Sequence, residues 1–287
     1  MKKLFLIGVL CLSLTAMGFS MGFSIKATGG LSLLFGGDYN SAVQGQNDIY
    51  NNVAGVTENS ELSKLSLGLD FGAEFILQFT PSMGVGIGAG YLHASNDSTL
   101  KVTGGAISLS EQYVPNVSAI PFTLNFHYFL PLGSRMKLHF FAGPGLYIIT
   151  SSEFKAAATE TVGAIEFIKL TTTFTPDTKV VFGFQGGAGI EFDMSPNFGL
   201  LFDMAGRYLS VSNITGSWVS EGHVGLIPVS ISKTGTLYYY EGKISGSYYG
   251  TLVSSDTLPS GVNIRNVREA SISLSGIQFQ LGIIFHF

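Results

Sequence analysis

Apolar and polar residues alternate along much of the chain. From residue 65 to residue 79 the odd positions are leucine, phenylalanine or alanine, whereas the even positions are mostly serine, glycine, glutamine or acidic residues. A period of two is typical of β-strands, and this run is much longer than an average strand of about five or six residues. A strand that crosses a bilayer needs about 9–11 residues, so the run favours a membrane-spanning strand.

The same pattern recurs in seven further segments. The eight predicted strands are residues 24–37, 65–79, 84–95, 117–130, 137–150, 179–193, 198–212 and 271–287. Their connections alternate in length: three are short and carry proline, at residues 80–83, 131–135 and 194–197, and four are long and polar, at residues 38–63, 96–116, 151–178 and 213–270. Short periplasmic turns and long extracellular loops are typical of outer-membrane barrels, and an even strand number places both termini in the periplasm.

Composition points the same way. The chain is 46% hydrophobic and 12% charged, against about 25% charged in ordinary soluble domains, and its mean hydropathy is +0.36. Beyond the first twenty residues no apolar run approaches the ~20 residues of a transmembrane helix, and only helices and closed barrels satisfy every backbone hydrogen bond in lipid. We therefore predict an all-β fold, an eight-stranded antiparallel up-and-down transmembrane β-barrel with long extracellular loops. Two further spanning strands within residues 213–270, which would give ten, remain an alternative.

The direction of the alternation distinguishes a membrane barrel from a soluble one. A lipocalin also has eight up-and-down strands, but it packs its large apolar side chains inside. Here the second face is dominated by glycine, serine and a few charges, which suits the narrow interior of an eight-stranded barrel. A register slip of one residue would place Asp70, Glu74 and Arg207 in lipid, where a cation at the midplane alone costs about 2–4 kcal/mol. The apolar face is therefore expected to meet lipid.

The N-terminus has the features of a cleavable export signal. Lys2 and Lys3 precede an apolar stretch at residues 4–14, and Ala16-Met17-Gly18 supplies the small residues that signal peptidase requires. We expect a signal peptide at residues 1–18 and the barrel at residues 19–287. The single cysteine lies inside the apolar stretch, so no disulfide is expected in the mature chain.

The last predicted strand resembles a known signal. Its apolar face ends on a terminal phenylalanine and consists of Ile277, Phe279, Leu281, Ile283, Phe285 and Phe287. This resembles the strand that the barrel assembly machinery reads in outer-membrane proteins, with Phe279, Leu281, Ile283, Phe285 and Phe287 as the signal. The hairpins at residues 81–86 and 196–200 are similar to those of the small outer-membrane β-barrel superfamily, which includes OmpA-type, opacity-type and OmpW-type proteins. The resemblance implies a bacterial outer-membrane location with lipid and the assembly machinery as partners, and it assigns no biochemical role.

A set of charged residues is predicted to face the barrel interior. It consists of Lys26, Asp70, Glu74, Glu191, Asp203 and Arg207. An unpaired ion is costly in a low-dielectric lumen, so opposite charges are expected to pair. Such a network either seals the barrel as a salt-bridged plug or forms a gate or binding site for a small ligand.

Other motifs give weaker signals. His93-Ala94-Ser95-Asn96 resembles the His-x-Ser-Asn stretch of lipid A deacylases, in which a histidine activates a serine nucleophile. His93 and Ser95 are thus remote catalytic candidates, with Glu111 as a possible orienting acid. The alternative is a rim histidine in a belt with tyrosines 91, 128 and 208. The remaining histidines lack metal-ligand spacing, and the glycine-rich stretches lie inside predicted strands, so neither a metal site nor a cofactor is expected.

The function predicted from these features is non-enzymatic. We expect a membrane anchor that presents its loops to a host or surface ligand, and the net charge of −4 argues against nucleic-acid binding. The last long connection is rich in aromatic residues, including Trp218, and is expected to extend the barrel as a hairpin that turns near residues 233–235 or to serve in recognition. The alternative functions are a narrow OmpW-like conduit for small hydrophobic molecules and, more remotely, a lipid A-modifying enzyme.

Overall fold

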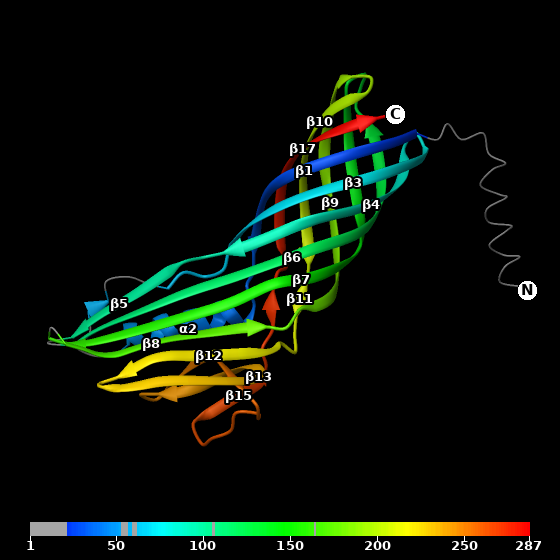
Figure 1. Ribbon diagram of the computed structural model, residues 1–287. Helices are drawn as coiled ribbons and strands as arrows, with labels where there is room; N and C mark the ends of the chain where they lie inside the picture. Colours follow the sequence, from blue (N-terminus) through cyan, green and yellow to red (C-terminus); the bar gives the residue numbers. More distant parts are fainter. Residues whose placement is uncertain (1–21, 53–56, 59–61, 105–106, 164) are drawn as a thin grey trace, which may run out of the picture.

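Antiparallel strands dominate the protein. The computed structural model describes residues 22–52, 57–58, 62–104, 107–163 and 165–287 (Figure 1), so the expected signal peptide at residues 1–18 lies outside the described residues. Within these ranges the one helix is α2 (Asp38–Asn51). No helix in this part of the chain is long and apolar enough to cross a membrane.

Eight strands form a closed ring. In order around it they are β1 (Gly22–Leu34), β3 (Leu67–Thr80), β4 (Met83–Ser95), β6 (Ile107–Pro131), β7 (Met136–Val162), β9 (Lys179–Ser195), β10 (Phe198–Tyr208) and β17 (Gly276–His286). The last strand closes on the first, with pairing from Ser24 opposite His286 to Leu34 opposite Gly276. The predicted eight-stranded antiparallel barrel is therefore confirmed, and the ten-stranded alternative is wrong.

A belt of apolar side chains covers the outside of the ring. On β3 exposed and buried residues alternate, with Phe71 50% exposed and Asp70 5% exposed. The belt includes Ile25, Leu31, Leu69, Phe75, Ile87, Phe122, Leu124, Phe126, Phe182, Phe184, Leu200, Phe202, Met204, Phe279, Leu281, Ile283 and Phe285. Water would not stabilise so continuous an apolar surface, whereas acyl chains do. The predicted orientation of the two faces is the one observed.

The barrel interior has three layers. At the end that carries the short turns and the C-terminus, Ile76, Phe129, Leu201 and Ile284 form an apolar cluster. The middle is charged, and the outer end is apolar again, with Leu65, Leu92, Tyr147, Leu209 and Leu274 all fully buried. The sequence analysis expected small and charged residues throughout the interior, and the two apolar layers correct that expectation.

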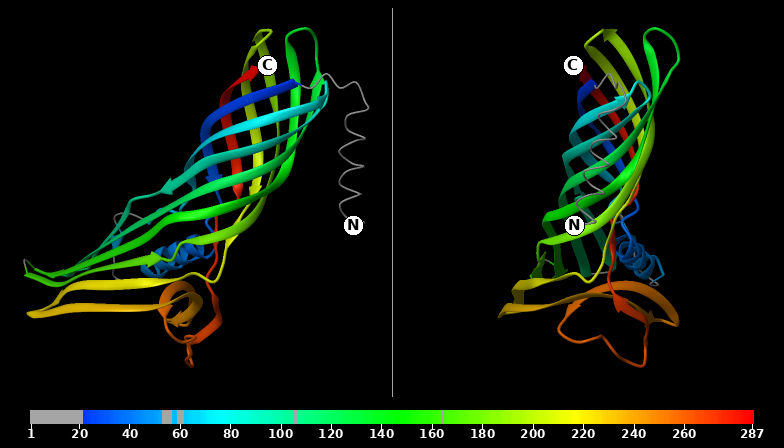
Figure 2. Two further views of the ribbon diagram at one scale, coloured as in Figure 1. Left: turned by 45° about the vertical axis from the view of Figure 1, so that its right-hand side comes forward. Right: turned by 90° about the vertical axis from the view of Figure 1, so that its right-hand side faces the viewer.

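Beyond the ring, the strands continue into a second body, here called the outer lobe (Figures 1 and 2). It comprises α2 and the outer parts of β6 and β7, together with β2 (Thr57–Glu58), β5 (Ser98–Gly104), β8 (Ile165–Pro176), β12 (Thr215–Val224), β13 (Ile227–Ile244), β14 (Ser247–Ser255) and β15 (Ile264–Glu269). Two short strands, β11 (Ser210–Val211) and β16 (Ile272–Ser273), pair where the lobe joins the barrel. The long connections predicted as polar loops are thus mostly sheet.

The predicted hairpin turn near residues 233–235 is wrong. These residues lie inside β13, where Lys233 pairs with Trp218 of β12. The chain turns instead at Gly225, with φ of 59°, and at Ser245-Gly246, with φ of 50° and 91°. These left-handed conformations favour glycine and close tight hairpins, so the segment makes two hairpins in place of one.

Helix α2 was missed because its sequence lacks an apolar run. Tyr39 and Val43 are buried on its inner side, while most of its other residues are asparagine, glutamine or small. Asp38, in the first turn, accepts hydrogen bonds from Arg268 Nη2 (2.6 Å) and from the Ser271 backbone N–H (2.9 Å). These bonds fasten the helix to the end of the last long connection.

Candidate functional site: the charged barrel interior

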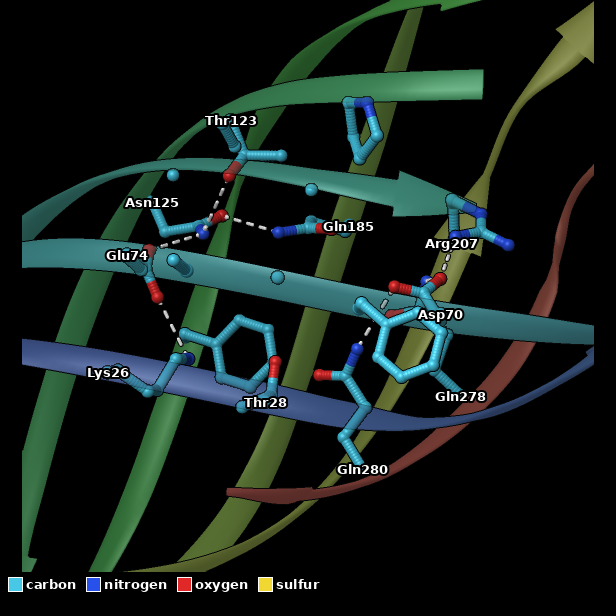
Figure 3. Close-up of a pocket in the computed structure, with 18 of the residues that line it drawn as sticks. Lys26, Thr28, Asp70, Glu74, Thr123, Asn125, Gln185, Arg207, Gln278 and Gln280 are labelled. Atoms are coloured by element: carbon cyan, nitrogen blue, oxygen red, sulfur yellow. Dashed lines mark hydrogen bonds and ion pairs between the residues drawn. The ribbon is translucent and has the colours of Figure 1, made fainter. Parts of the chain in front are cut away.

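The central charges are brought together by strand register. Lys26 on β1 lies directly opposite Glu74 on β3, and its Nζ is 2.8 Å from Glu74 Oε2 and 3.6 Å from Asp203 Oδ2 (Figure 3). Its ammonium also lies 4.8 Å from the centre of the Phe141 ring. One buried cation is therefore shared by carboxylates from two strands, which offsets the cost of removing these charges from water.

A pair of stacked histidines extends this cluster. His127 Nδ1 lies 2.7 Å from His139 Nε2, and His127 Nε2 lies 3.0 Å from Glu74 Oε1. His139 Nδ1 is 3.6 Å from Asp203 Oδ1. Both imidazoles are fully buried. Glu74, His127 and His139 are thus linked by hydrogen bonds, and Asp203 lies next to His139 without a hydrogen bond to it.

A second centre forms around Asp70. Its Oδ2 accepts hydrogen bonds from Arg207 Nη1 (2.7 Å), Gln278 Nε2 (3.0 Å) and Ser32 Oγ (3.2 Å), and its Oδ1 accepts one from Gln280 Nε2 (3.2 Å). Figure 3 shows Arg207, Gln278 and Gln280 near Asp70. A carboxylate with four donors is well compensated for burial.

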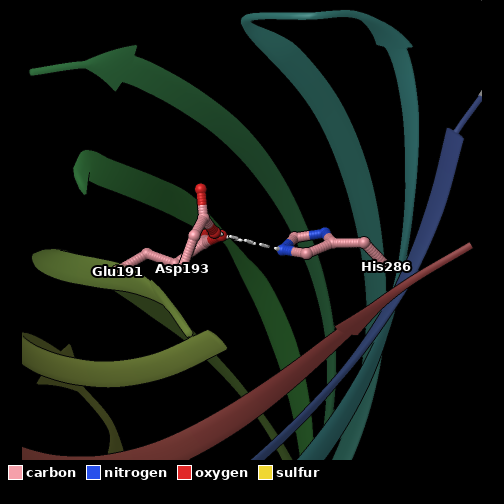
Figure 4. Close-up of side chains that lie close together, drawn as sticks. All are labelled: Glu191, Asp193 and His286. Atoms are coloured by element: carbon pink, nitrogen blue, oxygen red, sulfur yellow. Dashed lines mark hydrogen bonds and ion pairs between the residues drawn. The ribbon is translucent and has the colours of Figure 1, made fainter. Parts of the chain in front are cut away.

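The third centre lies near the end of the barrel that carries the short turns, and Figure 4 shows its side chains. Ligand atoms of Glu191, Asp193 and His286 all lie within 4.8 Å of one another, a grouping that could hold a metal ion. The sequence analysis expected no metal site. However, Lys137 Nζ is already bonded to Glu191 Oε1 (2.8 Å) and Asp193 Oδ1 (3.1 Å). The ammonium takes the position that a metal ion would need, so the geometry is that of an ion pair.

These centres leave little room in the lumen. The cavity bordered by Lys26, Asp70, Glu74 and Arg207 has a volume of ≈ 60 Å³, enough for a few water molecules. Apolar layers lie on both sides of it. The central cavity therefore has room for water but not for a larger solute.

The six interior residues expected from the sequence are all buried, at 6% exposure or less. Lys26, Glu74 and Asp203 form one group, Asp70 and Arg207 a second, and Glu191 a third. The sequence analysis missed the histidines 127, 139 and 286, as well as Asn125, whose amide donates to Glu74 (2.7 Å). The odd–even alternation along the strand places His127 and Asn125 on the inner face, so the sequence pattern could have identified these two residues.

The remote catalytic residues are not assembled into a triad. His93 Nδ1 lies 3.0 Å from the Oγ atom of Ser118, which is buried, whereas Ser95 is exposed. Glu111 accepts hydrogen bonds from Gln46 (3.0 Å) and Tyr50 (2.9 Å) in the outer lobe. The three residues thus serve different local contacts.

Two rim features also have clear positions. The expected assembly-signal residues of β17 point outward, with exposures from 38% for Phe279 to 68% for Leu281. Tyr128 pairs with Met83 at the short-turn end of the barrel. It therefore lies at the opposite rim from His93, and its assignment to one belt with His93 is wrong.

Comparisons with known proteins give distant structural matches only. No family model and no curated protein matches the sequence. A major outer membrane protein from Thermus thermophilus is 15% identical, with a TM-score of 0.39 over 93% of this chain and 100% of that chain. The outer membrane protein OprG from Pseudomonas aeruginosa is 14% identical, with a TM-score of 0.40 over 94% of this chain and 97% of that chain.

Proposed function

We propose that this integral outer-membrane β-barrel is a non-enzymatic surface protein that uses a closed barrel to hold its outer lobe rigidly outside the cell. The observation that carries the proposal is the continuity of the strands. β6 spans 25 residues and β7 spans 27 residues, well beyond the roughly 9–11 that cross a bilayer. The same strands form the barrel wall and the lobe, so β6 and β7 pass from one to the other without an intervening loop.

The lobe has a packed interior that is continuous with the apolar layer at the outer end of the barrel. Tyr39, Leu100, Val102, Phe174, Leu237 and Tyr239 are buried in it. Glu111 joins β6 to α2 through Gln46 and Tyr50, and the Asp38–Arg268 pair joins α2 to β15 at 2.6 Å. A lobe of this kind presents a fixed surface, as recognition requires.

The filled lumen supports the anchoring role over transport. Three charged centres and two apolar layers occupy it, and the central cavity measures only ≈ 60 Å³. Opening a path would require breaking buried ion pairs, each of which costs about 3–5 kcal/mol when one partner is lost.

The part of the lobe formed by β12–β15 can be removed by a single excision. Leu237 N–H donates to Ile214 O (2.8 Å), and Ala270 N–H donates to Leu237 O (2.8 Å), so Ile214 and Ala270 lie close together. Replacing residues 215–269 with a short Gly-Ser linker should remove β12–β15 and leave the eight-stranded ring. Folding is checked by the heat-modifiable gel mobility of the barrel. An epitope tag inserted between Ser245 and Gly246 serves as a control that alters the lobe without removing it.

Cell adhesion is the readout. Cells that express the whole protein should attach several-fold better than vector controls to matrix-coated or abiotic surfaces, and the tagged variant should match them. The excised variant should return to the control level. Equal adhesion by the excised variant, or no gain from the whole protein, would contradict the proposal.

One feature favours the alternative function, a narrow conduit for small hydrophobic molecules. A recess of ≈ 450 Å³ in the barrel wall is lined by Gly186, Gly206 and Gly276 and reaches Arg207. At Gly186 and Gly206, which face outward, the wall carries no side chain to fill it. A conduit that opens laterally into the bilayer would require such a part of the wall without side chains.

Uptake measurements separate the two functions. Proteoliposomes should take up small aromatic solutes no faster than protein-free liposomes, and planar bilayers should show no unit conductance. Gly206→Phe, which fills the recess, should change neither result. Uptake that the whole protein accelerates and Gly206→Phe abolishes would establish the conduit instead.

A further inference from the structure

The outer lobe contains a cavity of ≈ 300 Å³ that is separate from the barrel lumen. It lies between strands of β6–β8 and β12–β14, with Tyr39 of α2 contributing to its lining. Most of its wall is aromatic or aliphatic and includes Tyr39, Tyr113, Phe154, Phe174, Trp218 and Leu252. Its volume is at the lower end of the range for small-molecule sites, and such sites are lined mainly by apolar side chains with a few polar groups.

Two polar groups in the cavity wall have no partner. The Tyr39 hydroxyl and the Ser254 hydroxyl are buried, and neither makes a hydrogen bond with any described residue. Tyr39 is only 4% exposed. Burying a hydroxyl without a hydrogen bond is energetically costly, and native proteins rarely tolerate it. Both groups are therefore available to a ligand.

The charges around the cavity are already neutralised. Lys155 is the charged side chain in the wall, and its ammonium is half exposed and lies 2.8 Å from Glu153 Oε1. Burial raises the pKa of Tyr39, so its hydroxyl stays neutral and can donate a hydrogen bond at physiological pH. The site thus offers an apolar volume and hydroxyl donors, without a free charge.

We propose that this cavity binds a compact, uncharged and mostly apolar molecule from the external medium, whose single polar group hydrogen-bonds to Tyr39 and Ser254. The inference rests on the proposed function, because it takes the lobe to face the outside. A helix or a second copy of the chain is too large for the space. The molecule recognised by the surface protein is then a small amphiphile.

The chain contains one tryptophan, Trp218, and it lines the cavity. Its fluorescence therefore reports on the site directly. The protein is placed in liposomes and titrated with bromodecanol, whose bromine quenches nearby indole, with decanol as the unbrominated control. Probe dissolved in the bilayer stays away from Trp218, so saturable quenching measures occupation of the cavity.

Matched variants test the location of the ligand. Ala156 lines the cavity, whereas the alternation of β7 places Ala157 on the opposite face of the sheet. Ala156→Phe fills the site and should weaken binding at least about tenfold, while Ala157→Phe adds the same ring elsewhere and should leave it unchanged. Tyr39→Phe should weaken bromodecanol binding roughly two- to tenfold, the effect of one hydrogen bond, and should not affect bromodecane.

Gel mobility and fluorescence of the unliganded variants show whether each one folds, and Ser254→Val offers a second, less disruptive change. Absence of saturable quenching in the unmodified protein would overturn the proposal. So would equal binding by Ala156→Phe and Ala157→Phe, or a cavity filled by a co-purified acyl chain. Quenching without adhesion would contradict the proposed surface role and support the binding site. Adhesion without quenching would support the surface role and contradict the binding site.

Discussion

At the scale of single residues, the barrel interior depends on how closely backbones and charged groups approach one another. Gly86 on β4 faces the centre of the lumen. A Cβ atom at this position would lie 2.5 Å from both Glu74 Oε1 and His127 Nε2. The glycine is required because any side chain would separate two groups that are bonded to each other at 3.0 Å.

The first prediction follows from this crowding. Gly86→Ala should lower the free energy of unfolding by about 1–3 kcal/mol, the usual cost of overpacking, measured by urea unfolding in lipid vesicles. Gly72→Ala is the matched control, since its added Cβ would meet Thr28 Oγ1 at 3.5 Å, an ordinary contact. It should be neutral. Equal stability of the two variants would show that the interior is looser than described.

The Asp70–Arg207 pair gives a second prediction at this scale. Asp70→Asn and Arg207→Gln should each destabilise the barrel by about 3–5 kcal/mol, because each leaves a buried partner charge uncompensated. In the double variant neither charge remains, so its loss should be smaller than the sum by about 0.5–3 kcal/mol. The same urea measurement supplies the cycle. Strict additivity would mean that the two groups do not interact at their 2.7 Å separation.

At the scale of elements, the outer lobe is held by contacts that respond to solution conditions. Glu241 on β13 accepts hydrogen bonds from Asn266 Nδ2 (2.9 Å) and Arg265 Nε (2.7 Å) of β15. The hydrogen bond from Asn266 makes the largest contribution to lowering the pKa of Glu241, and the bond from Arg265 lowers it further. The carboxylate is therefore the charged link between the two strands.

A pH prediction follows with a definite sign. Because the folded pKa is lowered, the stabilisation is complete above the ordinary glutamate pKa of about 4.3 and is lost as the pH falls through the folded value. Hydrogen-exchange protection of β15, corrected for intrinsic rates, should therefore fall on acidification across that window. Glu241→Gln should show weak protection that no longer depends on this titration. An unchanged pH response in that variant would exclude Glu241 as the cause.

The elements differ in how far the sequence foretold them. The ring strands were predictable because each one presents alternate residues to lipid and to the lumen. Every second position of these strands therefore has to be apolar. β12 to β15 meet no lipid and are stabilised by pairing with β8 and with each other, which leaves no such alternation. The polar helix α2 is held by Asp38 and by burial of Tyr39, contacts that depend on distant residues.

The charged centres of the barrel interior likewise depend on contacts between residues that are distant in the sequence. Parity placed Lys26 and Glu74 on the inner face, but their direct pairing follows from the register of β1 and β3. The contact between His127 and His139 depends on the register in which His127 lies opposite Phe141 and Phe129 opposite His139. Separated histidines in the sequence therefore become neighbours only after the strands have aligned.

At the scale of the whole molecule, the proposed function gives the two parts different roles. The closed barrel anchors the protein in the membrane, and the rigid lobe acts outside it. The lipid-facing belt fixes the barrel in the bilayer, and the charged interior between two apolar layers closes it. Strands β6 and β7 continue from the barrel wall into the lobe, with one register shift between Ser118 and Ala119. The proposed recognition by the lobe and the proposed binding in its cavity would both require the barrel to lie in the membrane with its apolar face outward.

Site-directed spin labelling along β3 measures this orientation most directly. Single cysteines are introduced one at a time between Leu69 and Leu77, labelled, and placed in liposomes, and the accessibility of each label to oxygen is recorded. We predict a two-residue period in which labels at odd positions are exposed to lipid-dissolved oxygen and those at even positions, including 70 and 74, are shielded. The opposite phase, or no period of two, would contradict the account.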